Sequence, residues 1–350
     1  MGLREYIIRR LALLFPIMLG VVLLIFAIIQ FVPAQVRVSL YITGSIRELQ
    51  PAAVQEIISQ YGLDQPIWVQ FVDWFSQVIV GNFGYAESTQ EVVLTGLMIR
   101  VPATFEIVLV SAPLIIFVGI WLGVHSAVKK DKPFDQMTRV LSILGTSLPS
   151  FFFGVILLAT FVGQLRWVSP GRLSPQMATT LALMLKNGQF ARYTGLMLID
   201  SLLNWRPDYF IDALYHLMLP TLVLVFIQTA VLVRVTRSSM LEALGKTYII
   251  AARAKGLTKS EVIYKHARRN ALIPVVTISG LLVGGMMTGL IITETVFLFP
   301  GIGSWAATAA QRFDLSVVTA YAMFSAIVFV LANLIVDVLY AYIDPRIRLG

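Results

Sequence analysis

Six stretches of the chain are long and apolar enough to cross a lipid bilayer as helices. A transmembrane helix needs about 20 mostly apolar residues to cover roughly 30 Å of hydrocarbon. A chain built on such stretches is predicted to be an all-α integral membrane protein with six transmembrane helices. The predicted spans are Leu11 to Phe31, Pro102 to Val128, Val140 to Gly163, Ala213 to Val235, Pro274 to Thr293 and Ser316 to Tyr340.

The composition supports a membrane protein. Hydrophobic residues make up 57% of the 350 residues and charged residues only 13%, which is too apolar for a soluble surface. The chain has no cysteine, so disulfides, thiol catalysis and cysteine-ligated metal sites are excluded. Basic residues precede the first span, as in a signal peptide, but its core is long and no Ala-x-Ala cleavage site follows. We therefore predict that the first span is a retained anchor.

Lysine and arginine are distributed unevenly over the connections between the spans, and cytoplasmic connections are the more basic ones. The richer set contains Arg4, Arg9, Arg10, Lys129, Lys130, Lys132, Arg139, Arg237, Lys246, Arg253, Lys255, Lys259, Lys265, Arg268, Arg269, Arg346 and Arg348. The poorer set, spread over longer segments, contains Arg37, Arg47, Arg166, Arg172, Lys186, Arg192, Arg206 and Arg312. Both termini are therefore predicted to be cytoplasmic. Because the basic residues are distributed in this way, the net charge of +8 does not indicate that the protein binds nucleic acid.

Two long connections are predicted on the extracytoplasmic side. Residues 32–99 include an apolar face at near-helical spacing, which fits a helix lying at the membrane interface; it consists of Trp68, Phe71, Trp74, Phe75, Val78 and Ile79. Residues 166–212 include the apolar run Met177–Leu185, which is too short to span. We interpret both connections as caps available to a partner, the alternative being that they are merely long connections.

These features divide the chain into three parts. Residues 1–98 form an N-terminal helix with an extracytoplasmic loop. Residues 99–340 form the transmembrane core, which includes a cytoplasmic loop at 238–273 and the extracytoplasmic insert at 166–212. Residues 341–350 form a cytoplasmic tail.

The connection Leu241–Pro274 is compact, basic and organised, and we call it the elbow. Apolar positions recur at the helical period at Leu241, Leu244, Tyr248 and Ala251 or Ala252. Gly256 lies where a helix is expected to end, because glycine tolerates a positive φ. Thr258 and Glu261 have the spacing of a capping box at the start of a second helix. We predict two short helices around Gly256; the alternative is that the charge of this segment only sets topology.

The search for catalytic chemistry is mostly negative. Gly245–Thr247 resembles the end of a phosphate-binding P-loop, but Met240 occupies the position where that motif needs another glycine, and no strand precedes it. No metalloprotease, nucleophile-elbow or clustered-carboxylate motif is present. The three histidines, His125, His216 and His266, are scattered near the ends of the spans. We predict that the chain is not an enzyme, binds neither nucleotide nor metal, and uses its histidines structurally.

Two ionisable residues stand out within the spans, where charge is costly and functional roles are common. Glu106 lies near the outer end of the second span and is expected to reach toward the interface, and Asp337 lies near the inner end of the sixth. For both residues we favour a role in helix packing or anchoring over a role in transport. A proton-driven carrier would be expected to have more ionisable side chains within its spans, arranged as a proton relay.

The fifth span carries two overlapping pairs of small residues, which allow helices to approach closely in lipid. The minimum interpretation is a tight helix interface, and the alternative is that this helix lines the pathway. The residues assigned to this role are the four glycines of the two pairs and one polar neighbour, namely Gly280, Gly284, Gly285, Thr288 and Gly289. Polar Thr293 and Glu294 follow, and Phe299–Gly303 interrupts the helix just beyond. Glu294, Pro300 and Gly301 are the gate candidates.

The elbow also carries a family resemblance. Ala251–Gly256, with Asn270–Pro274 following, resembles the cytoplasmic EAA loop of binding-protein-dependent ABC importer permeases. Nearly the whole chain resembles the dipeptide and oligopeptide permease family, through Arg9–Arg10, Tyr61–Pro66, Gly81–Gly84, Pro102–Thr104, Ser147–Ser150, Thr293–Phe297, Pro300–Gly301 and Asp344–Arg348. The segment Gly195–Asp200 resembles the B subunits of dipeptide permeases most.

The resemblance implies a type I ABC importer permease fold in a bacterial inner membrane. Such a chain would pair with a second homologous permease subunit, while two cytoplasmic ATPase subunits would bind ATP and Mg and an extracytoplasmic binding protein would deliver the substrate. Dipeptides or short peptides are the expected cargo; nickel complexes, haem, antimicrobial peptides and sugars are alternatives, and an ion-driven secondary transporter is the alternative class. The expected ATPase-coupling residues are Glu242, Tyr248, Ala251, Ala252, Arg253, Ala254, Lys255, Gly256 and Leu257.

Two segments depart from the family pattern. Pro33–Val36 stands where the family often has Pro-Gly-Asp-Pro, which puts the geometry of the first outer loop in doubt. Glu242–Leu244 replaces the strict Glu-Ala-Ala opening of the cytoplasmic loop.

Overall fold

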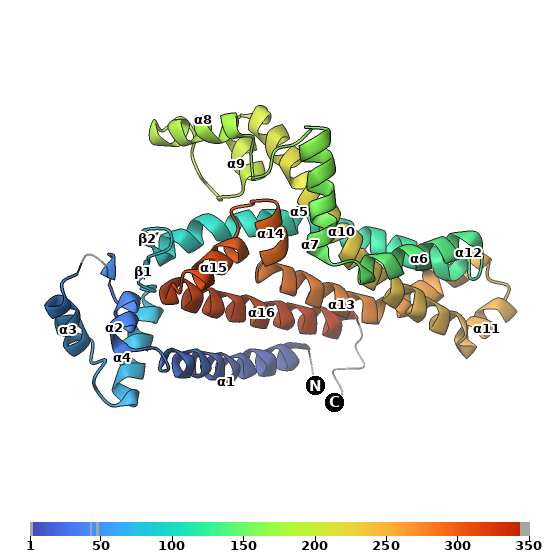
Figure 1. The fold of residues 1–350 in the computed structure, drawn as a ribbon. Helices are drawn as coiled ribbons and strands as arrows, with labels where there is room; N and C mark the ends of the chain where they lie inside the picture. The colour runs from blue at the N-terminus through green and yellow to red at the C-terminus, as the bar shows by residue number, and fades with distance from the viewer. Residues whose placement is uncertain (1–2, 43, 47–48, 344–350) are drawn as a thin grey trace.

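The computed structural model describes residues 3–42, 44–46 and 49–343, and it is built almost entirely of helices (Figure 1). The elements in chain order are α1 (Leu3–Ile29), α2 (Ala34–Arg37), η1 (Val38–Leu40), α3 (Pro51–Gln60), α4 (Ile67–Ile79), β1 (Tyr85–Ala86), β2 (Glu91–Val92), α5 (Val93–Val128), α6 (Pro133–Ser147), α7 (Ser150–Leu157), η3 (Leu158–Gln164), α8 (Pro175–Lys186), α9 (Met197–Leu203), α10 (Pro207–Leu244), α11 (Thr247–Ala254), α12 (Lys259–Glu261), η4 (Val262–Ala267), α13 (Arg268–Met287), α14 (Ile291–Val296), α15 (Ile302–Gln311) and α16 (Leu315–Ile343). The antiparallel pair β1–β2 was not predicted.

Five helical segments of the described chain are long and apolar enough to span a membrane, and a bent pair is a sixth candidate. The five are Leu11–Ile29, Val93–Val128, Pro207–Leu244, Lys259–Met287 and Leu315–Val336. All six predicted spans therefore have a helical counterpart. The side chain of Asp337 and the residues Arg346 and Arg348 lie outside the described part of the chain.

The third span is not the single straight helix that was predicted for Val140 to Gly163. It consists of α6 and of α7 continued by η3, with a bend of 101° between them. Leu148 and Pro149 have extended backbone angles at the bend. Proline lacks an N–H and disfavours helical angles in the residue before it, which accounts for the interruption.

The second elbow helix and the fifth span form one continuous helical segment, from Lys259 through η4 to Met287. The prediction had separated them at Pro274, which instead lies inside α13. At the other end α13 stops at Met287 rather than Thr293, and Gly289 follows with φ +123°. Gly285 and Gly289 therefore do not form a pair on one helix face.

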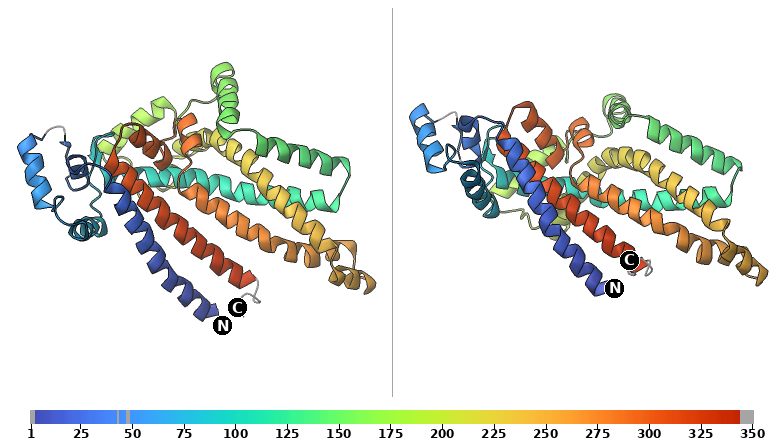
Figure 2. Two further views of the ribbon diagram at one scale, coloured as in Figure 1. Left: turned by 60° about the horizontal axis from the view of Figure 1, so that its bottom comes forward. Right: turned by 90° about the horizontal axis from the view of Figure 1, so that it is seen from below.

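The long helices α5 and α10 pack against each other at the centre of the bundle. A Cβ atom on Gly123 would lie 2.5 Å from the side chain of Thr236, and one on Gly119 would lie 2.7 Å from that of Leu232. Only small residues permit so close an approach of two helices. Helix α13 contacts α10 and α16, and α1 lies beside α16 (Figure 2).

The first outer connection folds against the outer end of α1 (Figure 1). Helix α4 confirms the predicted helix, but its apolar face is divided. Trp74 is buried, and Phe71 and Trp74 contact the ring of Phe26 on α1. Trp68 and Ile79 are each 68% exposed. The division arises because α1 offers an apolar partner to one side of α4; the interfacial placement of the exposed side stays a prediction.

The second outer connection forms a separate layer. Helices α8 and α9 lie over the outer ends of α5 and α10 (Figure 1). Leu181 and Leu198 belong to the same buried cluster as Tyr209 of α10, so the insert is packed onto the bundle. The elbow helix α11 lies at the opposite end of α5 and α10.

Candidate functional site

The elbow begins where α10 ends. Leu244 is the last residue of α10, Gly245 follows, and Lys246 is extended and precedes the first residue of α11. The predicted periodicity from Leu241 to Ala252 therefore runs across a break. Residues on both sides of the break are apolar because both helices pack on the same cluster, and periodicity alone does not reveal the interruption.

Helix α11 ends at Ala254, and Gly256, where the stop was predicted, follows the cap residue with φ +80°. The N–H of Leu257 donates to the carbonyl of Ala252 at 3.3 Å, and that of Gly256 donates to the carbonyl of Arg253 at 3.0 Å. These two bonds form a Schellman motif, which requires a left-handed residue at the glycine position. The elbow therefore turns through a fully hydrogen-bonded stop rather than a loose loop.

The predicted capping box at Thr258 is also present. The Thr258 hydroxyl accepts from the backbone N–H of Glu261, and the Glu261 carboxylate accepts from the backbone N–H of Thr258 at 3.0 Å. Each residue satisfies a donor that a helix start leaves unpaired. The second arm of the elbow thus begins at a fixed position only two residues after Gly256.

One face of α11 is anchored to the bundle. Ile249 is 0% exposed and Ala252 is 6% exposed. They pack in a cluster with Val124 of α5, Met240 of α10 and Val262 of η4. Because three helices contribute to this cluster, a force applied to α11 would be passed to all three.

The opposite face of α11 carries small, exposed side chains. At about 100° per residue, Thr247, Ala251 and Ala254 lie on the side of the helix away from Ile249 and Ala252. All three are exposed. Ala252 therefore serves the internal packing of the elbow, whereas the prediction had grouped it with the alanines that a partner could approach.

The other predicted coupling residues lie elsewhere around α11 and in the turn that follows it. Tyr248 and Lys255 are exposed, and Arg253 lines a hollow of about 500 Å³ together with Lys259 and Leu257. Neither Arg253 nor Lys255 forms an ion pair with another described residue.

Glu242 bridges the break between the two helices. Its carboxylate lies 2.8 Å from the Lys246 ammonium, at an exposed position. Exposed pairs of this kind contribute little to stability. Glu242 is thus free to exchange Lys246 for another cation.

A polar contact next to the elbow was not predicted. Asp135 of α6 is fully buried and accepts from the Arg237 guanidinium at Nε (2.7 Å) and at a terminal nitrogen (2.8 Å), and from the Ser126 hydroxyl. Arg237 had been interpreted only as a topogenic charge. The pair ties α5, α6 and α10 together before the elbow. No local pattern indicates it, since the partners are 102 residues apart.

The structure separates the glycines of the fifth span. A Cβ atom on Gly280 would lie 2.1 Å from Val336 of α16, and one on Gly284 would lie 2.7 Å from Ala332. A Cβ on Gly285 would have no neighbour within 4 Å. Gly280 and Gly284 therefore face α16, while Gly285 and the partly exposed Thr288 lie on an open face of α13.

The gate candidates form a buried polar centre on the side that was predicted to be extracytoplasmic. Glu294 is 0% exposed and accepts from the Thr104 hydroxyl at 2.6 Å and from the backbone N–H groups of Ser304 at 2.7 Å and Leu290 at 3.3 Å. The Thr104 hydroxyl in turn accepts from the N–H of Ile302. Burial raises the pKa of the Glu294 carboxyl, and these donors oppose the shift. We call Glu294, Thr104 and the three N–H groups the outer node; it joins α5, α14 and the start of α15.

Gly301 and Pro300 fit around the outer node. A Cβ atom on Gly301 would lie 2.2 Å from the Glu294 carboxyl carbon, so a side chain at this position would displace the carboxylate. Pro300 precedes it at an exposed position. Thr104 belongs to the Pro102–Thr104 motif, but nothing in the sequence pairs it with Glu294.

Glu106 does not reach toward the interface, contrary to expectation. It is fully buried, and its carboxylate accepts from Arg172 Nε at 2.8 Å and from the N–H of Leu198 at 2.6 Å. Arg172 also donates to the carbonyl of Gly195. Glu106 therefore clamps the insert onto α5, which accords with the anchoring role that was favoured. Among the described residues, no group of three His, Asp or Glu side chains is placed to hold a metal ion.

Comparisons with known proteins extend over almost the whole chain. Residues 115–349 match the family described as binding-protein-dependent transport system inner membrane component, and residues 3–108 match the N-terminal family of such membrane components. Similar proteins include the di/tripeptide transport system permease protein DppB of Pseudomonas aeruginosa (strain UCBPP-PA14), 38% identical over 98% of both chains. The dipeptide transport system permease protein DppB of Escherichia coli (strain K12) is also 38% identical, over 98% of both chains. The oligopeptide transport system permease protein AppB of Bacillus subtilis (strain 168) is 34% identical over 98% of this chain and 99% of its own.

Proposed function

This chain belongs to the binding-protein-dependent transport system inner membrane components, and we propose that it forms half of the translocation pathway of an ATP-driven importer for dipeptides or other short peptides. The cargo is inferred from the similar proteins, whose names specify dipeptides, di/tripeptides and oligopeptides. The other half of the pathway would come from a second, homologous permease subunit. In this arrangement a binding protein delivers the peptide from outside and both termini lie in the cytoplasm.

The observation that carries the mechanism is the two-sided character of α11. Ile249 and Ala252 are buried against the bundle, whereas Thr247, Ala251 and Ala254 are exposed and small. A partner groove can approach the exposed face closely while the buried face transmits its movement. We assign this face to one of two cytoplasmic ATPase subunits, which would bind ATP and Mg.

The charged elbow residues fit the same assignment. Arg253, Lys255 and Glu242 are exposed on the elbow and can form ion pairs with a partner. When the ATPase subunits close on ATP, α11 would be displaced together with α5, α10 and η4. Such a rigid-body rotation exposes the pathway to alternate sides of the membrane.

The outer node and the open face of α13 suggest where the pathway lies. Gly285 is exposed, with no atom within 4 Å of a Cβ built there, and the half-buried Thr288 lies on the same side of α13. Glu294 fixes the segment that follows α13 to α5 and α15. In our proposal the open face lines the pathway, and the segment held by the outer node closes its outer end.

Replacing Ala251 tests the coupling proposal. We expect Ala251→Trp to leave the permease inserted but to weaken ATPase-subunit binding about tenfold, because an overpacked contact costs about 1–3 kcal/mol. Retention of the ATPase subunits on the purified permease and ATPase stimulation by the loaded binding protein measure the effect. Ala52→Trp places the same side chain on an exposed part of the outer helix α3 and should retain the ATPase subunits normally. Undiminished retention and stimulation in Ala251→Trp would refute the assignment.

A transport assay tests the function itself. Proteoliposomes with the assembled importer should take up a labelled dipeptide only when binding protein is outside and ATP is on the ATPase side. An uncoupler should not reduce this uptake. Uptake driven by an imposed proton or sodium gradient without ATP would instead identify a secondary carrier. Mass spectrometry of the ligand retained by the co-purified binding protein would identify the cargo.

A further inference from the structure

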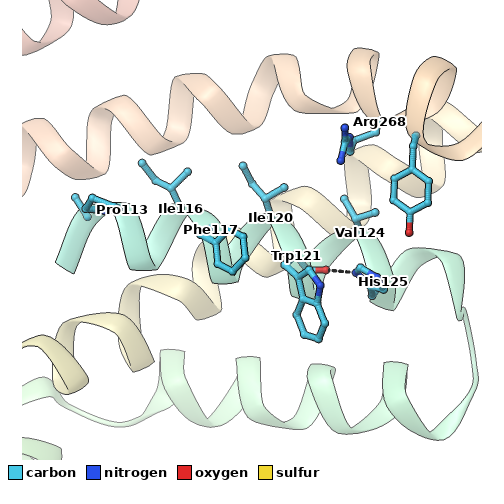
Figure 3. A pocket seen from close by; sticks show the side chains of 10 residues that line it. Pro113, Ile116, Phe117, Ile120, Trp121, Val124, His125 and Arg268 are labelled. Carbon is cyan, nitrogen blue, oxygen red and sulfur yellow. Dashed lines mark hydrogen bonds between the residues drawn. The ribbon is translucent and has the colours of Figure 1, made fainter. Parts of the chain in front are cut away.

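A groove beside the elbow is not used by the proposed coupling mechanism. It has a volume of about 630 Å³ and lies between α5 and the junction of η4 with α13. Pro113, Ile116, Phe117 and Ile120 form its apolar part. Figure 3 shows Ile116, Ile120 and Val124 on the side of α5 that faces the helix carrying Arg268.

The groove has a polar end with a cation. Arg268, Tyr264, His125 and Trp121 line it there. The Arg268 guanidinium lies 5.4 Å from the centre of the Tyr264 ring, and it forms no ion pair with any described residue. His125 Nδ1 lies 2.8 Å from the Trp121 carbonyl, so its Nδ1–H donates within α5, and Arg268 is the principal donor to a ligand.

The apolar part continues into a second hollow. This second hollow, of about 470 Å³, lies between α5, α13 and α16 and shares Ile116 and Ile120 as a wall with the first. Its other lining residues are also nearly all apolar, among them Val283 and Leu331. The two hollows thus adjoin at Ile116 and Ile120, and the first of them ends at the Arg268 cation.

We propose that this groove binds one diacyl phospholipid with an anionic headgroup, from the leaflet on the side of the elbow. Its phosphate is held by Arg268 and its two acyl chains occupy the two hollows. A guanidinium can donate two parallel hydrogen bonds to two oxygens of a phosphate. Trp and Tyr side chains are typical at the depth of lipid headgroups. The neighbouring basic residues Lys129 and Lys265 favour an anionic over a zwitterionic lipid.

The site is separate from the face that we assign to the translocation pathway. The residues of α13 that line the second hollow, including Gly280 and Val283, are rotated roughly 140° about the helix axis from the face of Leu281, Gly285 and Thr288, at about 100° per residue. A lipid in the groove would therefore contact α5, α13 and α16 without entering the pathway. It would lie against the helices that connect the elbow to the rest of the bundle.

Trp121 provides a local probe of occupancy. The assembled importer would be placed in nanodiscs containing either phosphatidylglycerol or phosphatidylcholine with brominated chains, which quench tryptophan fluorescence on contact. The Trp121 contribution is the part of the signal that Trp121→Phe removes. We expect brominated phosphatidylglycerol to quench this part at least twice as strongly as brominated phosphatidylcholine.

Two charge variants decide the outcome. Arg268→Gln should abolish the difference between the two lipids, whereas Arg269→Gln, which removes an exposed charge one residue away and outside the groove, should preserve it. Equal quenching by both lipids in the unmodified protein would overturn the anionic selectivity. Equal loss in both variants would show a general charge effect. No quenching by either lipid would show that a protein partner covers the groove, which also overturns the proposal.

Discussion

The elbow and the outer node hold the same bundle by opposite means. At the elbow, α11 is anchored by apolar side chains, Ile249 and Ala252, and its polar and small residues remain exposed. At the outer node, the buried carboxylate of Glu294 collects hydrogen bonds from three segments and leaves no oxygen exposed.

The difference follows from what each region has to do. Apolar packing is non-directional, so the elbow can shift slightly with its three helices without losing specific bonds. A buried carboxylate stabilises only the geometry that satisfies it, because an unpaired donor in the interior is costly. The outer node therefore fixes one arrangement of α5, α14 and α15, and the elbow presents a face for a partner.

Removing the carboxylate of the outer node should have the largest effect. Glu294→Ala leaves the Thr104 hydroxyl and the N–H of Ser304 without an acceptor in a buried site. We expect a loss of about 3–5 kcal/mol in stability. The midpoint of thermal unfolding in detergent measures it, and Glu294→Gln, which keeps one acceptor oxygen, should lose less. A midpoint within error of the unmodified protein would break the contrast between the two regions.

The Glu106 clamp should rank second. Glu106→Ala removes the carboxylate that accepts from Arg172, whose side chain is only 18% exposed, and from the N–H of Leu198. We expect a loss of about 3 kcal/mol, together with faster proteolysis within residues 166–212. Asp208→Ala in the same insert breaks a half-exposed pair with Arg206 and should cost about 0–1 kcal/mol. Equal proteolysis of both variants would show that Glu106 is not the anchor.

The smallest effect is expected at the elbow. Thr258→Ala removes the cap at the start of α12, which should cost about 1 kcal/mol, while Thr258→Ser should retain it. Thermal unfolding measures the loss, and ATPase-subunit retention should fall with it because the second arm loses its fixed start. Lys246→Ala, which breaks the exposed pair with Glu242, is the control and should leave the unfolding midpoint unchanged. A larger loss at Lys246 than at Thr258 would reverse the ranking.

Several features of this protein were predictable because their signals are local. The spans follow from runs of apolar residues, the stop at Gly256 from the freedom of glycine to adopt φ +80°, and the cap at Thr258 from a four-residue pattern. The helix of α4 follows from its apolar period.

Other features were missed or misassigned because their causes lie elsewhere in the chain. The break at Gly245 is hidden, since α10 and α11 pack on one cluster and keep the apolar period. Which glycine of α13 meets a neighbour depends on α16: Gly280 faces Val336, and Gly285 faces open space.

The sequence alone determined that this is a helical membrane protein with a basic elbow, and its motifs indicated the permease family that the comparisons confirm. Only the tertiary structure decided that Ala252 is internal while Ala251 is exposed, and that Glu294 meets Thr104 across 190 residues. Periodicity and caps act between near neighbours in the chain. Burial, close approach and the pairing of a carboxylate depend on which distant segment the fold places beside it.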